Sequence, residues 1–137
     1  MPSSYIEQAL VTLLRSSSSS SEVYAELGKK VFFAEAESAT AKPYAVLHTV
    51  SDPHMPFAFG EANSGQPRIQ ISVYDDDRFN ALEIAHKIRK RLRFFSGSMD
   101  GITVHKLDVG GTVLLRDPDE NVYQASIDVL PIYIDAS

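Results

Sequence analysis

The sequence has 137 residues and a mass of 15.1 kDa, the usual size of one domain with its own hydrophobic core. Hydrophobic residues make up 44% and charged residues 23%, which excludes a disordered, collagen-like or coiled-coil chain as the overall class. The 18 acidic residues outnumber the 13 basic ones and give a formal charge of −5. That balance argues against a protein whose main work is coating nucleic acid.

The sequence contains no cysteine, which excludes disulfides, thiolate nucleophiles and Cys-based metal sites. No stretch approaches the roughly 20 apolar residues that a bilayer span needs, and the N-terminus lacks the pattern of a secretory signal. We therefore expect a protein that makes no contact with membranes and is made in a cytoplasm.

The N-terminal part of the chain predicts one helix and two strands. Ser4 and Glu7 fit a capping box, and the apolar residues that follow recur at helical spacing, so a helix is predicted over 5–15. The six serines at 16–21 are typical of a loop or linker. Two short segments rich in β-branched and aromatic residues predict strands, at 30–34 and 44–50.

Residues 51–67 predict a long flexible loop, because they contain prolines and glycines and show no periodicity. Met55, Phe57 and Phe59 are unusual residues for a merely solvated connection. One interpretation is that the loop folds back over the core. The other is that it docks on a neighbouring subunit, where the burial of aromatic area offsets the entropy lost on ordering.

The second half of the chain predicts a sheet that surrounds one long helix. Alternating apolar and polar residues at 69–74 predict a strand, and a single apolar stripe predicts a helix over 77–95. Further predicted elements are strands at 102–109 and 112–116 with a turn at Gly110–Gly111 between them, a hairpin turn at 117–121, and a strand at 123–129 that continues past Pro131. Proline lacks an N–H, so Pro131 belongs at an edge, a bulge or a strand switch.

This order of elements predicts the α+β class and a single domain over 1–137. We expect a mostly antiparallel sheet of four to six strands, with two amphipathic helices packed on one face.

The sequence predicts no catalytic, cofactor or metal site. Asp75, Asp76 and Asp77 resemble a hard-cation site, but carboxylates at the start of a helix more often cap free amides. The four histidines are scattered without ligand spacing and are interpreted as structural or surface residues.

The strongest charge feature is a run of basic residues near the end of the predicted long helix. Five basic residues fall within 87–93, more than the one or two that a helix C-terminus needs. A solvated helix face is one interpretation. The other is a functional surface that meets DNA in a lumen or an acidic partner, for which the candidates are Lys87, Lys90, Arg91 and Arg93. Phe94 points away from the apolar stripe and is a candidate for contact with another molecule.

The sequence resembles the tail-completion family of long-tailed bacteriophages, also called tail terminator or head-to-tail joining proteins. The resemblance covers nearly the whole chain and rests on apolar periodicity and turn placement. The segments that carry it are 43–46 (PYAV), 68–74 (RIQISVY), 81–85 (ALEIA), 101–104 (GITV), 117–119 (DPD) and 122–129 (VYQASIDV). The serine run and the acidic triplet have no counterpart in that family pattern.

The resemblance implies a structural subunit and no enzyme activity or cofactor. Such a subunit forms a hexameric ring on the last ring of the major tail tube protein, stops tail growth and presents a surface to the head connector. Its implied location is the virion tail at the head–tail junction, after assembly in the bacterial cytoplasm. Genomic DNA would pass through the ring.

Two other classes of function remain as alternatives. A small α+β nucleic-acid-binding module would use exposed aromatic residues and nearby basic residues, but the charge of −5 and the absence of a recognisable RNA-binding motif weigh against it. A small enzyme or ligand-binding domain is weaker still, because no acid, base and nucleophile converge in the pattern.

Overall fold

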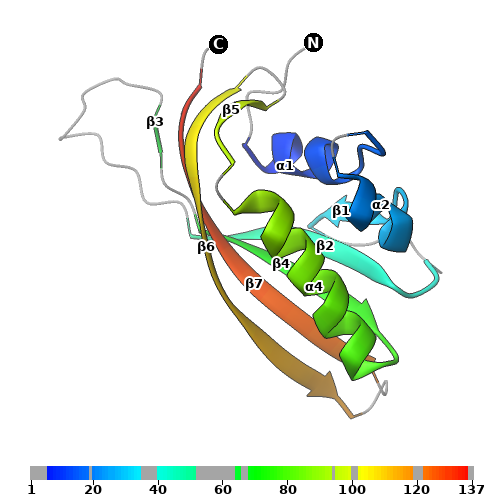
Figure 1. Cartoon of the computed structure of the whole chain (residues 1–137). Coiled ribbons are helices and arrows are strands. Elements are labelled where there is room, and N and C mark those ends of the chain that lie inside the picture. The colour runs from blue at the N-terminus through cyan, green and yellow to red at the C-terminus, as the bar shows by residue number, and fades with distance from the viewer. Residues whose placement is uncertain are drawn as a thin grey trace.

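The structure is a computed structural model that describes residues 6–18, 20–34, 40–51, 64–65, 68–93, 95–99, 102–118 and 122–135. These residues form three helices and one curled, seven-stranded sheet, with the helices packed on one side of it (Figure 1). The helices are α1 (Ile6–Leu14), α2 (Ser21–Leu27) and α4 (Arg78–Leu92). The strands are β1 (Val31–Phe33), β2 (Tyr44–Ser51), β3 (Ser64–Gly65), β4 (Arg68–Asp75), β5 (Gly97–Met99), β6 (Ile102–Asp117) and β7 (Val122–Asp135).

The expected α+β class and the mostly antiparallel sheet are confirmed. The strand order is β1-β2-β4-β7-β6-β5, and β3 pairs with the end of β7. The pair β1–β2 is parallel, and the other pairs are antiparallel. Strands β4 and β7 therefore occupy the centre of the sheet. None of the described helices is long and apolar enough to cross a membrane.

The core lies between the centre of the sheet and the helices. Every second residue of β4 and β7 points to the helices. Ile71 of β4 and Ile127 of β7 are two of these residues. They lie opposite each other in the pairing of the strands, and both are almost fully buried. Helix α4 covers them with one apolar stripe, as its sequence period predicts. The stripe consists of Ala81, Ile84, Ala85, Ile88 and Leu92. Burial of each large side chain stabilises the fold by about 1.5–3 kcal/mol.

The predicted turn at Gly110–Gly111 is wrong. Strand β6 runs unbroken through this pair, and the glycines lie at a register shift. Val109 pairs with Val129 and Thr112 pairs with Ile127, so three steps along β6 match two steps along β7. An extra residue in one strand is a β-bulge, which bends the strand and increases its twist. Glycine has no Cβ, so it adopts the backbone conformation of a bulge at little steric cost.

The interpretation of the serine run as a loop is wrong at its C-terminal end. Helix α2 begins at Ser21, and Ser20 is its N-cap residue. Ser20 is also buried, and its hydroxyl donates to the carbonyl of Leu13 at 2.8 Å. A side chain of this run therefore packs between α1 and α2, in a place where we expected only solvated residues.

The hairpin predicted at 117–121 is confirmed, because β6 and β7 pair antiparallel on either side of it, from Asp117 opposite Val122 onward. Pro131 sits within β7 opposite Leu107. On its other side, the pairing with β4 ends at Val129 and the pairing with β3 begins at Tyr133. Pro131 thus lies in a gap between two neighbours, which suits a residue that has no N–H to donate.

Candidate interaction surfaces

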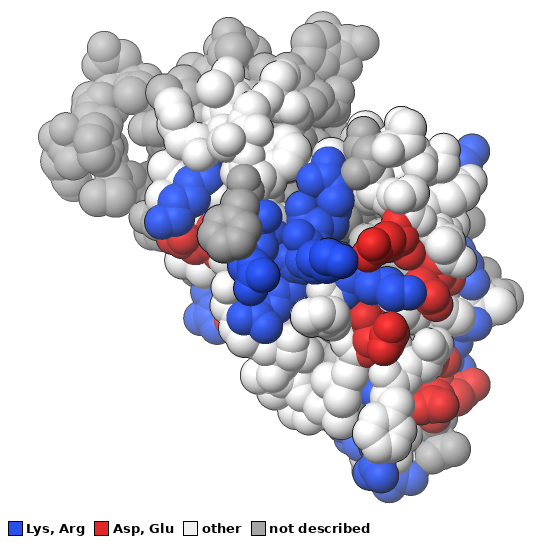
Figure 2. Space-filling view, in the orientation of Figure 1, with Lys and Arg blue, Asp and Glu red and all other residues white. Residues whose placement is uncertain are grey.

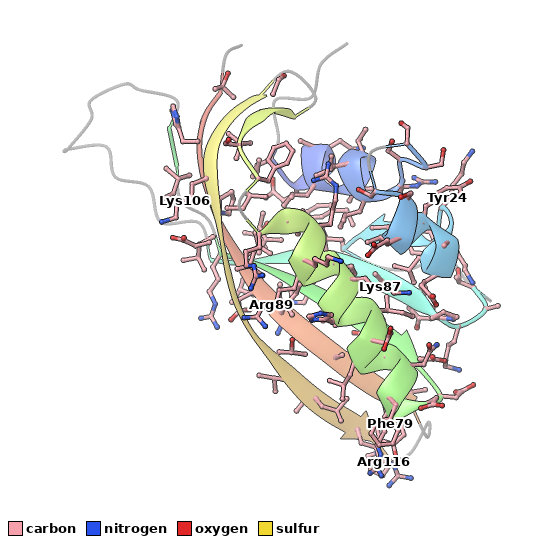
Figure 3. The ribbon with its side chains drawn as sticks, viewed as in Figure 1. Tyr24, Phe79, Lys87, Arg89, Lys106 and Arg116 are labelled. Atoms are coloured by element: carbon pink, nitrogen blue, oxygen red, sulfur yellow. The ribbon has the colours of Figure 1, made fainter. Side chains whose placement is uncertain are left out.

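Helix α4 carries the predicted basic surface on its C-terminal half. Figure 2 shows Lys and Arg side chains gathered over this part of the molecule, with acidic side chains of α2 at their border. The helix ends at Leu92, so Arg93 is its C-cap residue. Lys87 and Arg89 point to different sides, Lys87 towards α2 and Arg89 towards the long strands (Figure 3).

The lysines of this surface pair with carboxylates of α2. Lys87 Nζ lies 2.9 Å from Glu26 Oε1, and Lys90 Nζ lies 3.7 Å from Glu22 Oε1. Helix α2 was not predicted from the sequence, and neither were these pairs. The signal was present as two acidic residues four apart, Glu22 and Glu26, which share one helix face. Helix α2 therefore lies against α4 with its acidic face towards the basic one.

Arg91 links the basic surface to Ser20, the residue directly before α2. Its Nε–H donates to the hydroxyl of Ser20 at 3.2 Å, and its guanidinium stacks over the ring of Phe95, 5.4 Å from the centroid. A hollow of about 280 Å³ opens between the two helices, lined by Ser20–Val23 on one side and by Lys87, Lys90 and Arg91 on the other.

The contact with Glu26 affects the protonation of Lys87. The hydrogen bond to Glu26 raises the pKa of Lys87 above its ordinary value of 10.5, and the negative charges of Glu83 and Glu22 act in the same direction. Lys87 is therefore firmly cationic at neutral pH, and part of its charge is balanced by α2. Of the five basic residues, Arg89 is placed differently, because its Nε is buried and has no hydrogen-bond partner among the described residues.

The acidic triplet forms the start of α4. Asp77 is the N-cap residue, and its side chain accepts from the backbone N–H groups of Phe79 at 2.8 Å and Asn80 at 3.3 Å. Asp75 accepts from the side chain of Asn80 and from the N–H of Asp76. The capping interpretation is confirmed for Asp77. In the described part of the chain no three carboxylate or histidine side chains gather as a metal site.

The apolar candidates Met55, Phe57 and Phe59 lie outside the residues that the structure describes, and so does Phe94. Their role as a subunit interface stays a prediction. The described residues present a different set of exposed apolar side chains, which were not predicted from the sequence. Most of them lie near the two borders of the sheet: Phe33, Val50, Val113, Leu114 and Leu115.

The sheet face opposite the helices carries a polar cluster. The hydroxyls of Ser72 and Ser126 lie 3.0 Å apart, and the side-chain amide of Gln124 donates to both. Beside them the rings of Tyr44 and Tyr74 stack with centroids 5.2 Å apart. Burial, reinforced by Tyr44, raises the pKa of Tyr74 above 10.0, against a lowering effect of its hydrogen bond with Ser72.

Residues 8–133 match the protein family described as tail completion protein gp17. The chain belongs to the tail completion family. Membership gives this tail completion protein a structural role in tail assembly and confirms the resemblance seen in its sequence. No curated protein matches the chain in sequence.

A solved structure, the virion of a native gene transfer agent particle, contains a chain with the same fold. The two chains are 14% identical, the TM-score is 0.75, and the match covers 94% of each chain. A second match, to a crystal structure from Akkermansia muciniphila, is 14% identical with a TM-score of 0.29 and covers 66% of this chain and 41% of the other. Only the first supports the assignment of the fold.

Proposed function

We propose that this tail completion protein caps the tail tube as a ring, ends tail polymerisation and forms the joint to the head connector. The observation that carries the proposal is the family match over residues 8–133. The likeness of nearly the whole chain to a subunit of a phage-like virion supports it, because that subunit has the same fold in an assembled particle. The proposed partners are further copies of itself in a hexamer, the major tail tube protein and the head connector, at the head–tail junction of the virion.

The test is electron microscopy of particles from cells in which this gene is disrupted. We expect filled heads without tails beside free tails of irregular, excessive length. Resupply of the wild-type gene should restore normal particles. Tails of normal length joined to heads in the disrupted strain would refute the proposal.

The basic surface of α4 is the part of the molecule that we propose meets DNA in the lumen of the ring. The candidates are Lys87, Lys90, Arg91 and Arg93. The proposal is supported by the clustering of these basic side chains over one part of the molecule. The two carboxylates of α2 neutralise only part of their positive charge. Contacts with phosphates release counterions, so we expect weak binding of duplex DNA that falls steeply as salt rises.

A pair of charge-matched variants tests this placement. Lys90→Gln with Arg93→Gln removes two charges from the surface, whereas Lys29→Gln with Arg78→Gln removes two exposed charges elsewhere. We expect only the first variant to lose the salt-dependent DNA binding. If the purified protein binds no DNA and the first variant instead loses binding to the head connector, the surface faces an acidic partner protein.

A further inference from the structure

Strand β6 is the outermost strand of the sheet along most of its length. Strand β5 pairs with it only at 102–104. Over 105–116 none of the described strands pairs with the outer side of β6 (Figure 1). Successive backbone N–H and C=O groups of an edge strand point alternately inward and outward, so a row of them is left without a strand partner.

Charged residues lie near both ends of the open part of β6, at Lys106, Asp108 and Arg116, but the stretch between them has no such protection. Residues 109–115 read VGGTVLL, with no charged residue and no proline. Val113, Leu114 and Leu115 are 56%, 37% and 52% exposed. Edges of single chains are normally blunted by charges, prolines or short length, because an apolar open edge pairs readily with another strand. The bulge at Gly110–Gly111 bends this edge, and β6 continues as an extended strand from Thr112 to Asp117.

The opposite border of the sheet is open in the same way. Strand β1 has three residues and covers β2 only at 45–47, so the end of β2 has no described neighbour on that side. Phe33 of β1 is 46% exposed and Val50 of β2 is 47% exposed. Five of the seven large apolar side chains that are exposed in the described part of the chain therefore lie on these two borders.

We propose that the free edge of β6 pairs with the β1–β2 edge of a second copy of this chain, so that the sheet continues from one subunit into the next. The occupant is a second copy because both borders carry open backbone groups and exposed apolar side chains, so each border can cover the other. A two-fold pairing of β6 with itself would leave Phe33 and Val50 uncovered. A contact between two different patches is heterologous, and repetition with a rotation closes a ring.

The side chains that would meet can be named from the register. Leu114 pairs with Ala125 and Phe33 pairs with Leu47, and both of these partners face the helices. A sheet that continues between subunits keeps its faces, so Leu114 of one copy and Phe33 of the next lie on the same face. Val113 lies on the other face.

The inference rests on the proposed ring and is tested separately by thiol crosslinking of the full chain. The protein has no cysteine, so each introduced thiol is unique. Two differently tagged chains, Leu114→Cys and Phe33→Cys, are mixed and treated with a short bis-maleimide. We expect a crosslinked dimer that contains one of each tag, and a lower yield when Val113→Cys replaces Leu114→Cys. Thr103→Cys is the control, because it is exposed on β6 where β5 already occupies the edge.

Charge substitutions provide a second readout that does not depend on crosslinking. Val113→Lys with Leu115→Lys places charges on the open edge, whereas Thr103→Lys places one on the covered part of the same strand. Sedimentation is expected to show loss of the oligomer for the first variant only, with unchanged circular dichroism for both. Equal oligomerisation of all variants, or a wild-type chain that is monomeric at every soluble concentration, overturns the proposal.

The crosslinks also separate this inference from the proposed function. Dimers formed by Leu114→Cys alone indicate two-fold pairing of β6 and overturn the heterologous contact, whatever the tail phenotype. Mixed-tag crosslinks together with normal tails in the disrupted strain would uphold the pairing and refute the tail-capping role.

Discussion

Strands β4 and β7 in the centre of the sheet carry the same kinds of apolar side chain as β1 and β6 at its borders, but they differ in what covers them. Ile71 and Ile127 are enclosed by α4 and by neighbouring strands, whereas Val113 and Leu115 face outward. An apolar side chain stabilises a monomer only where the monomer removes it from water. The apolar side chains in the centre therefore stabilise the monomer, whereas those at the borders can contribute only when another molecule covers them.

The largest effect expected from this comparison is on folding stability. Ile127→Ala removes a fully buried side chain from the centre and leaves a cavity, so it should lower the free energy of unfolding by about 2–5 kcal/mol. Val113→Ala at the border should change it by less than about 0.5 kcal/mol. Urea denaturation of both variants at a concentration where the wild type is monomeric measures the difference. Equal losses would show that the border packs within the monomer.

The sequence predicted the centre of the fold well because its signals are local. The alternation in 69–74 and the apolar stripe of α4 each repeat over several residues, and burial follows directly from the period. The hairpin at 117–121 was predicted for the same reason, since proline and aspartate set the turn chemistry.

The features that the sequence analysis missed depend on contacts between distant segments. Helix α2 has seven residues, too few to be stable alone, and it is held by Val23, Leu27 and carboxylates that meet α4 more than 60 residues away. The glycine pair at 110–111 forms a bulge and not a turn, because the residues before it and the residues after it both pair with the same strand, β7. The basic residues were predicted on the correct helix, but their ion pairs with Glu22 and Glu26 could not be predicted because α2 itself was not.

A second way to sharpen the comparison uses the candidate interface of the 51–67 segment. Replacing Met55, Phe57 and Phe59 together with serine should leave the fold intact and prevent ring assembly, because these apolar residues lie outside the periodic core pattern. Circular dichroism checks the fold, and sedimentation checks the assembly. Unfolding of the variant would place these side chains in the monomer core instead.

A smaller effect is expected where α2 meets α4 through charges. Glu22→Gln with Glu26→Gln removes the carboxylates that pair with Lys90 and Lys87. We expect faster amide hydrogen exchange in α2 and a small fall in Tm, since ion pairs at the surface contribute little to global stability and only the Lys87–Glu26 pair is partly buried. The matched control is Glu83→Gln, which removes a carboxylate near Lys87 without changing α2. Faster exchange throughout the sheet would mean that α2 is part of the folding core.

The smallest expected effect is a loss of stability at alkaline pH. The pKa values of Tyr74 and Lys87 are raised in the folded protein, so the folded state holds these protons more tightly than the unfolded state does. Their stabilising contribution is therefore complete below the ordinary values of 10.0 and 10.5, and it is lost as pH rises through the higher values of the folded state. Tyr74→Phe should flatten the fall of Tm in this range, and Tyr44→Phe should flatten it less, because it removes only the neighbouring charge. An unchanged slope in Tyr74→Phe would indicate that the alkaline transition begins elsewhere, with Lys87 and the contact between α2 and α4 as the next region to test.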